Sequence, residues 1–197
     1  LFQTDAGQTE NIWIDDIILK PSLPLPEDYV PVPKVQDKAE GEPLVGIQTC
    51  DLWHEGKHFG WDKINQDPLR KPYLGYYDDG NSEVKDWEIK YMAEHGIDFS
   101  MHCWYRPSGG MGQPIKDPRN GASIHDGLFH SQYRDKIKFA IAWENASEST
   151  DETDFRENIV PFWMEYYFKD SGYLLVDNKP VIGFYDVNGL IASFGKD

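Results

Sequence analysis

Short apolar runs alternate with amphipathic segments through most of this chain. The clearest apolar run covers residues 139–142, between Lys136-Ile137-Lys138 and the triplet Trp143-Glu144-Asn145. A short apolar run bounded by polar residues is typical of a buried strand, because a buried helix needs more length. Runs of this kind predict four strands after residue 43, over residues 44–53, 97–105, 139–142 and 180–185.

Amphipathic segments between these runs predict the helices. The clearest begins at Asn81 or Ser82, either of which can cap it. It ends before Gly96, which can adopt the left-handed conformation common after the last helical residue. Its apolar side chains recur on one face and are Val84, Trp87, Tyr91 and Met92. Further helices are expected over residues 126–133, 155–168 and 189–194, with Pro161 kinking the second of these or beginning its second part.

Four strands that alternate with helices predict an α/β fold with a parallel sheet and right-handed crossovers. Two architectures fit residues 44–197: a small open sheet, or the N-terminal half of a (β/α)8 barrel of the TIM type. A complete barrel takes about 250 residues. If the fold is a barrel, this chain carries half of it.

A different pattern precedes residue 44. Residues 11–19 read as a strand, but residues 21–43 hold six prolines among charged residues and predict an extended linker. A single strand is not stable without partners. We therefore interpret residues 1–20 as the last strand of an upstream β-sandwich, residues 21–43 as a Pro-rich linker, and residues 44–197 as the α/β domain.

Composition narrows the choice of partners. The formal net charge is -15, from 19 basic and 34 acidic residues, so no basic surface is expected for nucleic acid or an anionic membrane. Aromatic residues make up 14% of the chain, which suits stacking on sugar rings. No signal peptide or membrane-spanning segment is recognisable.

The two cysteines, Cys50 and Cys103, each lie near the end of an expected strand. A disulfide would require those strands to be neighbours, and two buried thiols are the favoured interpretation. No Cys or His spacing predicts structural zinc, and the glycine-rich residues 106–123 lack the Gly-Lys-Ser/Thr signature of a phosphate-binding loop. We expect no cofactor and no metal.

Acidic residues at strand ends are the candidates for catalysis, because ligands bind at the carboxyl ends of parallel strands. Glu144 follows the third strand and Asp186 follows the fourth, where it can alternatively cap the next helix. Glu148 is a weaker candidate within an acidic loop. Glycoside cleavage needs one carboxylic acid for the leaving oxygen and a second group as nucleophile or base.

Aromatic, histidine and amide side chains near the same ends are candidates for substrate binding. For His54 and His102, the alternatives to substrate binding are a metal site with Asp51 and a structural role with both ring nitrogens bonded. The aromatic rings can instead belong to the core. The candidates are Trp53, His54, His102, Trp104, Tyr105, Trp143 and Asn145.

Five short motifs, in order and with matching spacing, resemble a known family. Residues 44–197 resemble the WbsX-like, glycoside hydrolase family 99-like group of (β/α)8 barrels. The motifs are KPYLGYYD at 71–78, EHGIDF at 94–99, CWY at 103–105, KFAIAWEN at 138–145 and YLLVDNKPV at 173–181. The resemblance implies a barrel that acts on glycans through carboxylates at strand ends, and Glu144 carries over. The second glutamate of family 99 has no counterpart nearby except Glu148.

The segment WIDDIIL at residues 13–19 resembles the closing strand of the jelly-roll carbohydrate-binding modules that accompany secreted glycosidases. With the barrel resemblance, it favours a secreted or cell-surface, endo-acting glycoside hydrolase whose partner is an oligo- or polysaccharide. Two alternatives stay open: a non-catalytic glycan-binding barrel, and a WbsX-like glycosyltransferase of polysaccharide metabolism.

Overall fold

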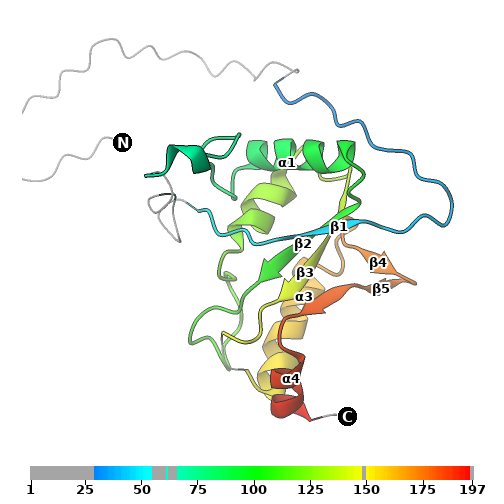
Figure 1. The fold of residues 1–197 in the computed structure, drawn as a ribbon. Helices are drawn as coiled ribbons and strands as arrows, with labels where there is room; N and C mark the ends of the chain where they lie inside the picture. The colour runs from blue at the N-terminus through cyan, green and yellow to red at the C-terminus, as the bar shows by residue number, and fades with distance from the viewer. Residues whose placement is uncertain (1–28, 55–60, 62–65, 148–149, 196–197) are drawn as a thin grey trace, which may run out of the picture.

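The computed structural model describes residues 29–54, 61, 66–147 and 150–195. Its centre is a parallel sheet (Figure 1), which confirms the predicted α/β class. The strands follow each other in the sheet as they do in the chain, in the order β1-β2-β3-β6. They are β1 (Gly46–Thr49), β2 (Phe99–Trp104), β3 (Lys138–Trp143) and β6 (Ile182–Phe184).

Helical segments lie between the strands and after the last one. The two longest are α1 (Ser82–Glu94), between β1 and β2, and α4 (Val187–Phe194), after β6. The other segments are the turn η2 (Pro68–Arg70), the pair η3 (Ser123–Gly127) and η4 (Leu128–His130), and the series α2 (Glu152–Asp154), η5 (Phe155–Ile159) and α3 (Val160–Tyr166). The helix expected over residues 126–133 is therefore two short segments that begin earlier.

Helix α1 begins and ends as predicted but packs on a different face. The Asn81 side chain accepts hydrogen bonds from the amides of Glu83 and Val84, and Gly96 has a φ of +74°. The buried positions are Lys85, Asp86, Ile89 and Ala93, whereas the stripe that contains Trp87 and Tyr91 is half-buried. The buried side of the helix therefore includes a lysine and an aspartate.

The fourth parallel strand is shorter than predicted. Lys179–Pro180 forms strand β5, which pairs in antiparallel fashion with β4 (Leu175–Val176). Asp177 and Asn178 connect them with φ angles of +51° and +61°, values typical of a two-residue hairpin turn. Pro180 thus belongs to this hairpin, and β6 begins two residues later. Pro161 begins the second part of its helix, which is one of the two predicted roles.

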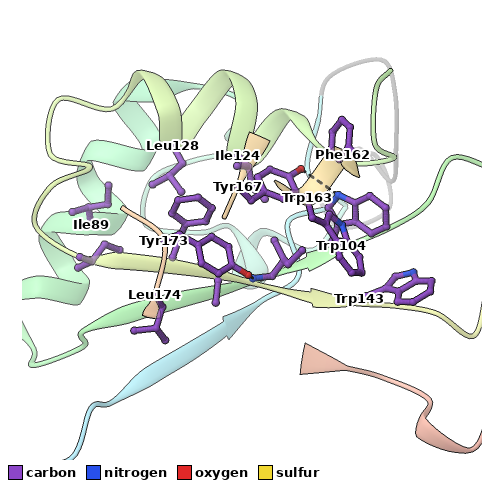
Figure 2. Close-up of a cluster of buried hydrophobic side chains, with 14 of the residues drawn as sticks. Ile89, Trp104, Ile124, Leu128, Trp143, Phe162, Trp163, Tyr167, Tyr173 and Leu174 are labelled. Carbon is purple, nitrogen blue, oxygen red and sulfur yellow. Dashed lines mark hydrogen bonds between the residues drawn. The ribbon is translucent and has the colours of Figure 1, made fainter. Parts of the chain in front are cut away.

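The hydrophobic core lies between the sheet and the helical segments (Figure 2). Side chains from α1, β2, β3, η3 and α3 contribute to it, and they include Ile89, Trp104, Phe139, Ile141, Ile124 and Trp163. In β2 every second side chain is buried, so the other face of this strand is only half-buried. The described residues thus cover one face of the sheet and leave hollowed, accessible surface on the other.

Residues 29–43 form no helix or strand, but they are packed against the α/β part of the chain. Val30 is buried in the core, and its carbonyl accepts a hydrogen bond from the Tyr133 hydroxyl. Lys38 forms an ion pair with Asp98, the residue before β2. The expected strand at residues 11–19 lies outside the described residues. None of the described helices is long and apolar enough to cross a membrane.

Candidate functional site

The uncovered face of the sheet carries a hollow of about 770 Å³. Its walls come from the carboxyl ends of all four parallel strands and from the loops that follow β2 and β3. The lining residues are Gln48, Cys50, Met101, Cys103, Tyr105, Arg119, Ala142, Glu144, Ser147, Gly183, Phe184 and Tyr185. A hollow at this place is where ligands bind in parallel α/β folds.

Glu144 lies where β3 ends, as the sequence predicted, and its side chain faces the hollow. Its amide donates a hydrogen bond to the Trp104 carbonyl, which extends the β2–β3 ladder by one step. One carboxylate oxygen accepts a hydrogen bond of 3.2 Å from the Ser147 amide. Among the described residues that line the hollow, Glu144 is the only carboxylate. The backbone thus holds this carboxylate at the strand end.

Tyr105 forms the neighbouring wall. The Arg119 guanidinium lies 4.8 Å from the centre of its ring, and the two residues also form an isolated β-bridge. Burial raises the pKa of the Tyr105 hydroxyl, and the nearby Cys50 and Glu144 add to the rise. The hydroxyl therefore stays protonated at neutral pH and is available as a hydrogen-bond donor.

A buried ion pair secures the loop that leads to Arg119. Arg106 follows β2 and donates a hydrogen bond of 2.6 Å to the Asp154 carboxylate, with both side chains almost fully buried. The same oxygen of Asp154 accepts a hydrogen bond from the Gly112 amide. No local sequence pattern reveals this pair, because its members are 48 positions apart in unrelated segments.

Asp186 and Asn145 hold the backbone together rather than facing the hollow. The Asp186 carboxylate accepts a hydrogen bond of 2.9 Å from the Gly189 amide, so it caps α4, the alternative role considered for it. The Asn145 side chain donates to the Asp186 carbonyl and accepts from the Asp186 amide. Both residues therefore join the end of β3 to the start of α4.

Trp104 and Trp143 are core residues, which corrects the expectation that they stack on sugars. They are 2% and 1% exposed, and they contact each other and Trp163 through ring edges. Figure 2 shows them among the buried side chains, with the Trp104 indole donating a hydrogen bond to the Tyr167 hydroxyl. Neither ring offers a face to a ligand, because strand alternation turns both toward the helices.

His102 is also buried on the helix side, so it is not positioned to contact a substrate in the hollow. Its Nδ1 lies 2.6 Å from an oxygen of Asp51 and its Nε2 lies 2.9 Å from the Ser100 hydroxyl. Both ring nitrogens thus have partners within the protein, as in the alternative of a satisfied structural histidine.

His54 lies apart from His102, in the loop after β1. Its Nδ1 is 2.8 Å from an Asp78 oxygen, and its ring borders a second hollow of about 370 Å³ that Arg119 also lines. Within the described part of the chain, no group of three or more His, Cys, Asp or Glu side chains could hold a metal ion. Trp53 stacks on Trp61 with ring centres 3.8 Å apart, so one of its faces is already covered.

A charged cluster around Lys85 joins the segments behind the site. The Lys85 ammonium lies 2.8 Å from Glu88, 3.5 Å from Asp51 and 3.6 Å from Asp79, and its side chain is 3% exposed. Asp79 in turn forms two hydrogen bonds with the backbone of Trp53. Its carboxylate accepts one from the Trp53 amide, and its own amide donates one to the Trp53 carbonyl. The cluster therefore fixes the loop that carries Trp53 and His54.

Burial and charge shift the pKa values in this cluster in opposite directions. Burial alone would raise the pKa of Asp51, but attraction to Lys85 and His102 and hydrogen bonds from His102 and Thr49 hold it well below its usual range. Burial raises the pKa of Asp79 to about 7 despite Lys85. Burial alone would lower the pKa of Lys85, but the three surrounding carboxylates raise it.

The cluster was not predicted from the sequence, although the sequence contains one signal of it. Lys85 has the spacing of Ile89 and Ala93, four residues apart on one helix face, so a lysine stands in an apolar stripe. A lysine at such a position is rarely buried without carboxylate partners. Asp51, at the end of the preceding strand, was a recognisable candidate for that role.

The two cysteines are not both buried, contrary to the favoured interpretation. Cys50 is exposed, Cys103 is half-buried, and both are free thiols. They follow the paired residues Thr49 and His102 on neighbouring strands. Burial raises the pKa of the Cys103 thiol, and Cys50 adds to the rise.

No protein-family model matches this sequence, and neither does any curated protein.

Proposed function

We propose that residues 44–197 form the first half of a (β/α)8 barrel, with a glycan site at the carboxyl ends of its strands. The strand order supports a barrel half. In an open doubly wound sheet the order reverses at a switch point and helices cover both faces. Here β1-β2-β3-β6 run in sequence without a reversal, and the core of the described residues lies on the helix side. The uncovered face would become the inside of the barrel.

The observation that carries the glycan proposal is the position of Glu144. Its carboxylate lies at the end of β3, on the uncovered face, in the same hollow as Tyr105, Arg119 and Tyr185. Such a wall combines an acid, a guanidinium and phenol groups, which together can bind sugar hydroxyls and pack against a sugar ring. The volume of about 770 Å³ is within the usual range for a small-molecule site.

The reaction we propose is endo-type hydrolysis of a glycosidic bond, with Glu144 as one of the two carboxyl groups. Glycosidases of the common types need a second carboxyl group, and the distance between the two carboxyl groups determines the stereochemical outcome. Asp186 is engaged as the cap of α4, and Glu148 lies outside the described residues. The second acid is accordingly expected from Glu148 or from the other half of the barrel. We further propose that the protein is secreted and that a β-sandwich precedes the barrel in the same chain.

One observation favours a second candidate, a glycan-binding barrel without hydrolytic activity. Glu144 is the only carboxylate among the described residues that line the hollow, while Tyr105 and Tyr185 remain accessible there. A single acid beside aromatic rings suffices to bind a sugar but not to cleave one by the two-carboxylate route.

One experiment on the full chain and its Glu144→Gln variant distinguishes the hydrolase from the non-catalytic glycan-binding barrel. Binding is measured on a glycan array, and release of reducing ends is measured on a panel of polysaccharides that includes α-mannan, xylan and β-glucan. We expect the variant to lose hydrolysis by at least about 100-fold, the usual contribution of a catalytic acid or base. Glu165→Gln is the matched control, because Glu165 is exposed on α3 and paired with Lys169.

The outcomes have distinct meanings. Binding without release in the wild type supports the non-catalytic barrel. Release that persists in Glu144→Gln removes Glu144 from the mechanism. Neither binding nor release on any glycan overturns the glycan proposal.

A further inference from the structure

Cys50 and Cys103 occupy neighbouring positions on two adjacent strands. In the parallel β1–β2 pair, the last aligned residues are Thr49 and His102. Each cysteine follows one of them directly, so the two Cα atoms continue the same register. Neighbouring strands lie about 4.8 Å apart, and disulfides join Cα atoms that are about 4.4–6.8 Å apart. The backbone therefore places the two residues within reach of a disulfide.

Both side chains point to the same face of the sheet. Thr49, Asp51 and His102 contact one another on the helix side, with Thr49 Oγ1 3.2 Å from His102 Nδ1. Because side chains alternate along a strand, Cys50 and Cys103 lie on the opposite, uncovered face. Both line the 770 Å³ hollow. The pair is thus accessible from that hollow rather than sealed in the core.

The two sulfur atoms have different surroundings. Cys50 is exposed, and its Sγ lies 3.6 Å from the Tyr105 hydroxyl. Cys103 is half-buried, and its Sγ accepts a hydrogen bond of 3.5 Å from the Gln48 side-chain amide. A reagent from solution reaches Cys50 first, and Cys103 stands behind it as the second thiol.

We propose that Cys50 and Cys103 are a redox pair that closes into a reversible disulfide across β1 and β2. The oxidant is a small-molecule disulfide. The Cys50 thiolate attacks one of its sulfur atoms, which forms a mixed disulfide and releases one thiol. The Cys103 thiolate then attacks Cys50 Sγ, which releases the second thiol and closes the bridge. Two electrons pass to the oxidant, and the two cysteine protons end on the released thiols or the solvent.

The bridge would change the wall of the hollow. Once Cys103 Sγ is bonded to Cys50 Sγ, the Gln48 amide loses a thiol acceptor and the Tyr105 hydroxyl loses its thiol neighbour. Both groups could then turn toward a ligand. This consequence rests on the proposed glycan site, and we expect the glycan affinity to differ between the two redox states by roughly 2–10-fold, the effect of one hydrogen bond.

The test equilibrates the full chain in buffers of reduced and oxidised glutathione, traps thiols by alkylation, and locates each bond by intact mass and peptide mapping. The chain contains only two cysteines, so every product can be assigned. We expect the wild type to lose two hydrogen atoms and to yield one crosslinked peptide with Cys50 joined to Cys103. Addition of a reductant should restore both thiols.

Two single variants are the matched controls, and each retains one thiol. Cys103→Ser should stop at a mixed disulfide between Cys50 and glutathione, because no second thiol resolves it. Cys50→Ser should react more slowly, since Cys103 is the less accessible thiol. The proposal is overturned if the wild type instead carries two glutathiones, forms only disulfide-linked dimers, or stays fully reduced in a buffer that modifies Cys103→Ser.

Glycan binding is then compared between the reduced and oxidised wild type. If the bridge forms but affinity is equal in the two states, the link to the site is wrong and the redox pair stands. If neither state binds any glycan, the proposed function fails, whereas the disulfide result is unaffected.

Discussion

The two faces of strands β1 and β2 differ in how accessible their polar side chains are. On the helix side, polar groups are buried and bonded to one another, with Asp51 and Ser100 on either side of His102 and Lys85 beside them. On the uncovered side, Cys50, Cys103 and Tyr105 line an accessible hollow. The first set stabilises the fold, and the second is available to a ligand.

A chemically suggestive arrangement of side chains implies a function only where a ligand can reach it. Ser100, His102 and Asp51 have the hydrogen-bond order of a hydrolytic triad, at 2.9 Å and 2.6 Å. Yet the Ser100 side chain is almost fully buried under the helix layer, so no substrate reaches it. The less conspicuous Glu144 lies on the face that a ligand can reach.

The largest effect is expected from breaking the buried cluster. Lys85→Met removes the cation that three carboxylates share, and uncompensated buried charge should lower the free energy of unfolding by about 3–5 kcal/mol. Urea denaturation measures the change. Lys169→Met is the control, since Lys169 is 64% exposed in a surface pair and should change stability by less than about 0.5 kcal/mol. Equal effects of the two substitutions would contradict the larger contribution of the buried cluster to stability.

A pH series tests the same cluster more finely. Because burial raises the pKa of Asp79 from 3.8 to about 7, the folded state keeps a proton that the unfolded chain has lost in that range. The free energy of unfolding should therefore fall as pH rises from 3.8 to 7, by at most about 1.4 kcal/mol per pH unit from this group. The lowered pKa of Asp51 changes the free energy of unfolding only at lower pH than this range.

Asp79→Asn identifies the group responsible for that slope. An amide is neutral at every pH, so the variant should show a flatter profile of urea stability between pH 4 and 7, while Glu165→Gln should keep the wild-type slope. Superimposable profiles for the wild type and Asp79→Asn would assign the pH dependence to other groups.

The smallest effect concerns the end of β6. Asp186→Ala removes the cap of α4 and should cost about 1 kcal/mol, whereas Asp186→Asn keeps a capping oxygen and should be nearly neutral. Thermal denaturation distinguishes the two. If both variants retain full stability yet lose glycan turnover, Asp186 acts in the reaction rather than as a cap.

Local patterns accounted for much of the fold. The alternation of apolar runs and amphipathic segments predicted the parallel sheet, Asn81 and Gly96 marked the ends of α1, and Pro161 marked the start of α3. Each of these depends on neighbours within a few residues, so the sequence carries the information directly. The position of Glu144 at the end of β3 follows from the same reasoning.

The order of the elements, and the strand ends at which polar side chains gather, can thus be predicted from local sequence patterns. The face of the sheet that each of those side chains occupies depends on how distant segments pack together. Side chains alternate with a period of two, so a boundary uncertainty of one residue exchanges the faces. Trp104 and His102 are buried, while Tyr105 and Cys103 line the hollow, because α1 and α3 cover one face and contacts such as Lys85–Asp51 bridge distant segments.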